Sequence, residues 1–165
     1  MISRIASTTC LVALLGAFGG CAVDTAPTPE TPAVLELGSG SWRFEPLEEG
    51  QAVSMVRGAQ GGWHVWLSFR ASGMESDRAT LEIESQVADA SRPPQHTVVD
   101  VRLERPDVEG RRNYIGWPEV LADPGCLIGD TLRIEATLTD EAGVQVATQR
   151  AITLMGGDDP PTVCP

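Results

Sequence analysis

The sequence contains no lysine: all of its 12 basic residues are arginine, and 23 acidic residues outnumber them. The formal net charge is therefore −11 at pH 7. Nucleic acids and anionic lipid surfaces attract proteins through basic surfaces, so a charge this negative argues against either as a sequence-independent partner. We expect no nucleic-acid partner, and we interpret the negative charge mainly as a source of solubility.

Short catalytic motifs are absent too. There is no Gly-x-Ser-x-Gly elbow, no Gly-rich phosphate loop, no paired-histidine metal motif and no Cys-x-x-Cys. Two histidines leave few choices for a general base, although the many acidic residues leave a carboxylate pair open. We predict that the protein is not an enzyme and needs no cofactor.

The first 20 residues have the layout of a secretory signal. They contain one basic residue, Arg4, no acidic residue, and an apolar run from Leu11 to Phe18. That run is shorter than the about 20 apolar residues that span a bilayer. We expect residues 1–20 to be removed on export.

The end of this segment, "FGGC", resembles the lipobox of bacterial lipoproteins, with Phe18 where that pattern prefers leucine. The resemblance implies lipid attachment at Cys21 and anchoring in a membrane. Ala22 follows, and not the aspartate that retains enterobacterial lipoproteins at the inner membrane, so the resemblance implies an outer-membrane location. Ordinary signal-peptidase cleavage after Ala22 is the alternative.

A spacer is predicted to follow, over residues 21–40. Pro27, Pro29 and Pro32 alternate there with threonine and glutamate, which favours extended polyproline II. Residues 41–165 are then long enough for one domain with its own core and a C-terminal tail.

The count of four cysteines supports the prediction that Cys21 carries a lipid. Cys10 leaves with the signal and Cys21 carries the lipid, so Cys126 and Cys164 remain as an even pair. Because the cell envelope is oxidising, we predict a disulfide between these two residues. Two unpaired thiols are the alternative.

Hydrophobic residues in the predicted domain alternate with a period of two. Turn signals such as "GAQGG" and "DEAG" separate the alternating segments, and no segment has a convincing helical period. We predict an all-β fold, an antiparallel immunoglobulin/fibronectin-like β-sandwich of about eight strands, with a closed β-barrel as the structural rival. The predicted core positions on three strands are Leu81, Ile83, Val87, Val99, Val101, Leu103, Leu132, Ile134, Ala136 and Leu138.

The segment "WHVWLSFR", residues 63–70, places a histidine between two tryptophans. Alternation puts Trp63, Val65, Leu67 and Phe69 on the core face and His64, Trp66, Ser68 and Arg70 on the other. We therefore expect His64 to be an exposed strand residue beside an outward Trp66. Such a tryptophan needs a cover, either a loop of its own domain or a binding partner.

The letters "GGWHVWLSF" also resemble the metal-binding strand of PCuAC-type periplasmic copper chaperones. The resemblance implies Cu(I) binding by His64, although Trp66 stands where that family has a methionine ligand. Met74 and His96 are further candidate ligands. A periplasmic copper-binding protein is thus the alternative function.

A second region, residues 110–126, has the arginine and aromatic composition that is enriched at protein interfaces. The candidate binding surface from the two regions comprises His64, Trp66, Arg70, Arg111, Arg112 and Tyr114. The alternative is that the second region is a strand and loop that cover the core.

The lipobox, the Pro/Thr spacer, "QGGWHVW" and the late hairpin "TLTDEAG" together look like the uncharacterised β-sandwich lipoproteins of myxobacteria and related bacteria. That resemblance implies a cell-envelope address. We predict a membrane-anchored envelope lipoprotein that acts as a binding or structural interaction module for another envelope protein.

Overall fold

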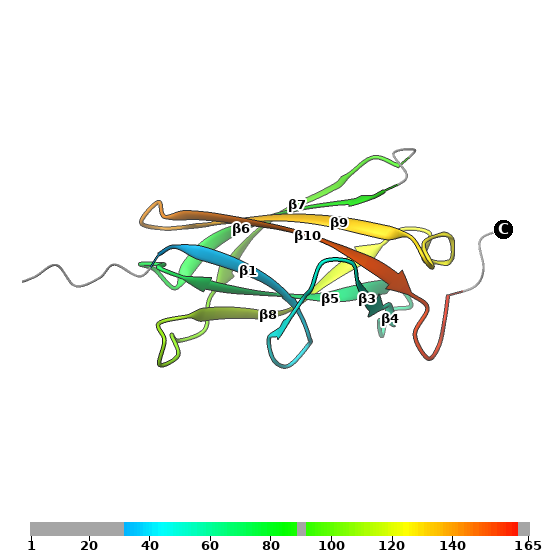
Figure 1. The fold of residues 1–165 in the computed structure, drawn as a ribbon, viewed down its shortest axis with the longest axis horizontal. Coiled ribbons are helices and arrows are strands. Elements are labelled where there is room, and N and C mark those ends of the chain that lie inside the picture. Colours follow the sequence, from blue (N-terminus) through cyan, green and yellow to red (C-terminus); the bar gives the residue numbers. More distant parts are fainter. Residues whose placement is uncertain (1–31, 89–91, 162–165) are drawn as a thin grey trace, which may run out of the picture.

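The protein folds as two β-sheets packed face to face, in a computed structural model that describes residues 32–88 and 92–161 (Figure 1). Sheet A contains β1 (Val34–Ser39), β2 (Glu45–Pro46), β4 (Val56–Arg57), β5 (Trp63–Ser72) and β8 (Arg112–Leu121). Sheet B contains β3 (Gln51–Ser54), β6 (Arg78–Val87), β7 (Gln95–Arg102), β9 (Thr131–Asp140) and β10 (Gln145–Met155). One short 3-10 helix, η1 (Pro124–Cys126), connects β8 to β9.

The predicted all-β sandwich is confirmed. β5 and β8 pair in sheet A, whereas the strands that follow each of them along the chain, β6 and β9, pair in sheet B. Every strand pairing is antiparallel except that of β3 with β10, which is parallel. The described residues form ten strands, because the count of about eight missed very short strands such as β2 and β4.

The core lies between the two sheets and is built by the inward residues of alternating strands. All ten core positions predicted on β6, on β9 and in the region of β7 pack there, with Val99 only partly buried. The turn after β5 adds Met74, and η1 is followed by the buried Leu127. Period-two alternation therefore identified the core face of each of these strands correctly.

The predicted spacer extends too far along the chain. Val34–Ser39, which the sequence placed within residues 21–40, form β1 and pair with β5 along its whole C-terminal half. The physical reason is visible in "VLELGS": Leu35 and Leu37 point into the core while Glu36 points out. The domain thus begins before residue 41.

Several predictions concern residues outside the described ranges. The signal at 1–20, Cys21 and Cys164 all lie there, while Cys126 ends η1 beside the core residue Leu127. The disulfide between Cys126 and Cys164 therefore stays a prediction. Within residues 32–88 and 92–161, the structure contains no helix with the length and apolarity needed to cross a bilayer.

Asp140, at the end of β9, joins two turns at one end of the sandwich. Its Oδ2 accepts hydrogen bonds from the backbone N–H groups of Glu75 and Ser76, at 2.9 and 3.1 Å. Its Oδ1 accepts one from the Val144 N–H at 2.9 Å. Burial acts to raise the pKa of Asp140, but these backbone donors outweigh burial and lower it below its ordinary value of 3.8.

We expect Asp140→Ala to lower the free energy of unfolding by about 1–3 kcal/mol, because it leaves three partly buried N–H donors without their acceptor. Urea unfolding measures this, with Glu135→Ala on the exposed face of β9 as a control that shifts stability by less than about 0.5 kcal/mol. The contribution of Asp140 is present above pH 3.8 and is lost as the pH falls through its lowered folded-state pKa. Equal losses in the two variants contradict this role.

Candidate functional site

Strand β5 occupies the middle of sheet A. β1 and β4 pair with one side of it and β8 with the other. Val65, Leu67 and Phe69 point into the core, as predicted. The prediction of an exposed His64 is wrong: its side chain is only 7% exposed. Ser68, on the same outer face, is fully buried. At these two positions the outer face of the strand is therefore covered as well.

The loop between β1 and β2, which we call the cover loop (residues 40–44), covers one half of this outer face. Ser68 Oγ donates a hydrogen bond to the Gly40 carbonyl at 2.8 Å. The Arg70 guanidinium carbon lies 4.0 Å from the centre of the Phe44 ring, in a cation–π contact. Phe44 itself packs on Gly38, where an added Cβ would lie 2.6 Å from the ring. A loop of its own domain thus covers this part of β5.

A β-bulge in β8 fits the cover loop onto the sheet. The register between β5 and β8 shifts between Leu67 and Phe69, where β8 contributes one extra residue. Gly116, at the bulge, has φ +80°, and an added Cβ would lie 3.0 Å from the Ser41 carbonyl oxygen. Its N–H donates to Ser68 Oγ at 3.2 Å, so Ser68 links the bulge to the loop. Glycine is required here by both conformation and space.

The other half of the outer face carries the Trp66 patch, which we define as Val56, His64, Trp66, Pro118 and Val120. Strand register places Val56, His64 and Val120 in one row across β4, β5 and β8. Trp66 and Pro118 form the next row on the same face. Val120 is 53% exposed, and Val56 and Pro118 are also exposed. An apolar patch on a sheet face marks a candidate interaction site.

His64 is the buried centre of this patch. Its ring meets the Trp66 ring edge to face, with centroids 4.4 Å apart and an interplanar angle of 82°. The β4–β5 turn covers it, since an added Cβ at Gly58 would lie 3.6 Å from the imidazole. Its Nε2 atom is buried without a hydrogen-bond partner among the described residues. Burial lowers the pKa of His64 below its ordinary value of 6.5.

We therefore expect acid to destabilise the fold through His64. The unfolded chain takes up a proton as the pH falls below 6.5, whereas the folded chain does so only at a lower pH, so stability decreases across that interval. His64→Leu removes the buried imidazole and flattens the pH dependence in urea unfolding between pH 7 and pH 5. His96→Leu, at an exposed histidine of β7, serves as the control and keeps the wild-type slope. An unchanged slope in His64→Leu contradicts the assignment.

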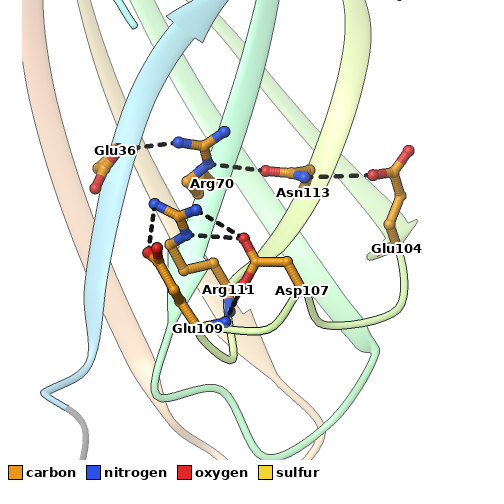
Figure 2. A network of polar contacts seen from close by, with 7 residues as sticks. All are labelled: Glu36, Arg70, Glu104, Asp107, Glu109, Arg111 and Asn113. Carbon is orange, nitrogen blue, oxygen red and sulfur yellow. Dashed lines mark hydrogen bonds and ion pairs between the residues drawn. The ribbon is translucent and has the colours of Figure 1, made fainter. Parts of the chain in front are cut away.

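Arg70 and Arg111, two of the three arginines of the predicted binding surface, make polar contacts within the domain (Figure 2). Arg70 donates to Asn113 Oδ1 at 3.1 Å and lies 4.0 Å from Glu36, so it joins β5 to both of its neighbouring strands. Asn113 in turn donates to Glu104 at 3.4 Å. Arg70 thus braces one end of sheet A.

Arg111 holds the loop between β7 and β8 in shape. It donates from Nε to Asp107 at 2.9 Å and pairs with Glu109 at 2.8 Å. Hydrogen bonds led by the backbone N–H of Arg111 hold the pKa of Asp107 below its ordinary value of 3.8. Arg112 lies half-buried at the start of β8, opposite Ala71. For Arg111 the geometry favours the structural interpretation over a binding role.

Tyr114 also belongs to the core side. It lies opposite Phe69 in the β5–β8 register and packs against the core cluster, and burial raises the pKa of its phenol. The structure therefore separates the six predicted surface residues. His64 and Trp66 belong to the Trp66 patch. The other four residues, Arg70, Arg111, Arg112 and Tyr114, lie at the other end of sheet A, where Arg70 and Arg111 make the polar contacts of Figure 2.

Glu119, which the sequence analysis did not single out, is a buried carboxylate between the sheets. It is 1% exposed and lies on the core face of β8, opposite Val65. Ser85 Oγ donates to its Oε1 at 2.6 Å, and Trp117 Nε1 donates to its Oε2 at 3.1 Å. The alternation of β8 from Trp117 to Leu121 could have shown that Glu119 faces inward. The bulge at Gly116 shifts the alternation by one residue, so the strand as a whole does not show a regular period of two.

A cleft of about 420 Å³ opens beside Ser85, at the edge of the core. Its walls are mainly apolar, with Val87, Pro94, Leu121 and Leu132 among them, and Arg92 stands at its rim. Arg92 donates to the Ala122 carbonyl at 3.2 Å and pairs with Asp123 at 3.7 Å. Since these polar groups bind one another, the cleft presents mostly apolar walls.

The three candidate copper ligands do not come together. His64 lies on the outer face of sheet A, and His96 lies on the outer face of sheet B, opposite Glu84. Met74 packs in the core after β5. Nowhere in residues 32–88 and 92–161 do three or more His, Cys, Asp or Glu side chains form a group that could hold a metal ion.

Comparison with protein-family models and with curated proteins found no match to this chain.

Proposed function

We propose that this protein is a membrane-anchored lipoprotein of the cell envelope, and that its sandwich acts as an interaction module through the Trp66 patch. The observation that carries the proposal is the apolar outer face of sheet A around a half-buried tryptophan. Outward positions of such a sheet normally carry polar residues. Here Val56, Val120 and Pro118 occupy them instead.

The cover loop extends this surface. Trp42, two residues before Phe44, is 92% exposed on the loop that packs over the outer face of sheet A. Tryptophan supplies a large apolar area together with one N–H donor, and it is enriched among residues that dominate binding energy. A tryptophan this exposed is costly in water without a partner. The outward β9 residues of sheet B, in contrast, are Arg133, Glu135, Thr137 and Thr139.

The partner of this surface is, on the same argument, a protein with an exposed apolar region. A chain with a net charge of −11 repels acidic surfaces at long range. The Trp66 patch contains no acidic side chain, so apolar contact is the attraction that it offers. We propose another envelope protein as that partner.

Membrane attachment is tested separately at Cys21. Metabolic labelling with an alkyne fatty acid is expected to mark the wild-type chain and to leave Cys21→Ala unlabelled, because the thiol is the acylation site. The Cys126→Ala variant is the control that keeps the label. Labelling that survives in Cys21→Ala rejects the anchor without affecting the assignment of the patch.

Site-specific photocrosslinking tests the patch. We expect a photoreactive amino acid in place of Trp42 to give a discrete adduct in the native envelope. The adduct should be lost when Val120→Asp is added, because a carboxylate at that position must be desolvated on contact. Mass spectrometry of the adduct identifies the partner, and its purified form must then bind the wild-type chain.

Two controls make the result specific. The same photoreactive residue in place of Thr137, on the outer face of sheet B, is expected to give no such adduct. Thermal unfolding of Val120→Asp should match the wild type, since Val120 is exposed and lies outside the core cluster. Equal adducts from Trp42 and Thr137, or an adduct that Val120→Asp leaves intact, reject the patch as the binding surface.

A further inference from the structure

The edges of the two sheets differ in how they are protected against pairing with another strand. β8 ends sheet A, but it carries the Gly116 bulge and Pro118, which both interrupt a ladder. β2 and β4 are two residues long and β3 is four. Short strands, bulges and prolines are the usual means by which proteins prevent edge-to-edge association.

β7 is an edge strand of a different kind. It ends sheet B, and over its eight residues, "QHTVVDVR", it has no proline and pairs with β6 in an unbroken register. The chain has no lysine, which is the residue most often used to protect such edges. Figure 1 shows the hairpin of β6 and β7 extending from one end of the sandwich. Among the described residues, β6 is the one strand that pairs with β7, so the outer side of β7 is open to another strand.

The sequence of β7 is self-complementary about Val98. In an antiparallel pair of two identical strands, facing residues must point to the same face, so the two-fold axis has to pass through a residue. With the axis at Val98, each His96 faces Asp100 of the second copy, and the two Val98 side chains face each other. Val98 is 54% exposed on the outer face, beside exposed His96 and Asp100.

Neighbouring registers lack this match. An axis at Thr97 places His96 opposite Val98, and an axis at Val99 places Val98 opposite Asp100 and His96 opposite Arg102. Only the Val98 register joins a carboxylate to an imidazole N–H twice and an apolar residue to its equivalent. Cross-strand pairs that hydrogen-bond or pack against each other contribute to the stability of a sheet.

We propose that two copies of this chain associate through β7, antiparallel and centred on Val98, so that two B sheets form one continuous ten-stranded sheet. The occupant of the open edge is thus a second copy of the chain. This inference goes beyond the proposed function, because it uses sheet B and leaves the Trp66 patch on the opposite face unoccupied.

Disulfide crosslinking in the full chain tests the register. Val98→Cys is expected to form a covalent dimer under mild oxidation, because facing residues in an antiparallel pair have Cβ atoms about 4.5–5.5 Å apart. Asp100→Cys alone should stay monomeric, since its two copies are separated along the strands by about 13 Å, four residues at about 3.3 Å each. A mixture of His96→Cys and Asp100→Cys chains should crosslink to each other.

The matched control is Thr137→Cys on β9, a strand that has neighbours on both sides. It should give no more dimer than the unaltered chain, which measures any background from Cys21, Cys126 and Cys164. Dimer from Thr137→Cys equal to that from Val98→Cys, or from Asp100→Cys alone, overturns the register. No dimer above background from Val98→Cys overturns the proposal.

Sedimentation velocity tests the association without crosslinking. The wild-type chain should shift from monomer to dimer as its concentration rises, and Val98→Lys should remain monomeric, because it places two like charges opposite each other at the axis. Thr137→Lys makes the same change of charge on an internal strand and should dimerise as the wild type does. A wild type that stays monomeric throughout, or equal behaviour of the two lysine variants, contradicts association through β7.

Discussion

The packing of β5 on both of its faces is the constraint on which the rest of sheet A depends. Its inward residues Val65, Leu67 and Phe69 are fully or almost fully buried in the core. Its outward residue Ser68 is also fully buried and holds both the cover loop and the β8 bulge. A strand in the middle of a two-layer sandwich normally has one face in water. Here the cover loop forms a partial third layer over sheet A, and the Trp66 patch lies outside that layer.

The sequence revealed the fold because its alternation is local. Strands β6 and β9 alternate without interruption, so their core faces could be assigned from Leu81 and Leu138 outward. β1 was missed because it follows the Pro/Thr segment without a turn signal, and because alternation within it is limited to Leu35, Glu36 and Leu37. The predicted boundary between spacer and domain is therefore inaccurate, because the composition changes gradually there.

The candidate site could be predicted only in part, for a physical reason. Alternation correctly placed His64 and Trp66 on the outer face of β5, but burial on that face depends on distant residues such as Phe44 and Gly58. The same limit applies to Arg111, because its contacts with Asp107 and Glu109 stabilise the β7–β8 loop and could not be predicted from strand alternation. It applies to Glu119 as well, because the Gly116 bulge shifts the phase of β8. The alternation of a strand predicts the face toward which each side chain points, whereas the loops that pack on that face determine how exposed the side chain is.

The outer face of sheet A and the edge of sheet B offer different kinds of contact, and this difference has a consequence for assembly. The Trp66 patch lies on sheet A, and the open edge at β7 belongs to sheet B. Pairing through β7 lengthens sheet B within its own plane and does not cover the outer face of sheet A. Both copies in such a dimer therefore keep their Trp66 patches accessible. Two patches on one rigid body bind a repeated or clustered partner more tightly than one patch does, provided that the spacing of the partner sites matches. The proposed dimer would thus strengthen a weak apolar contact made by the Trp66 patch, without adding a residue to that patch.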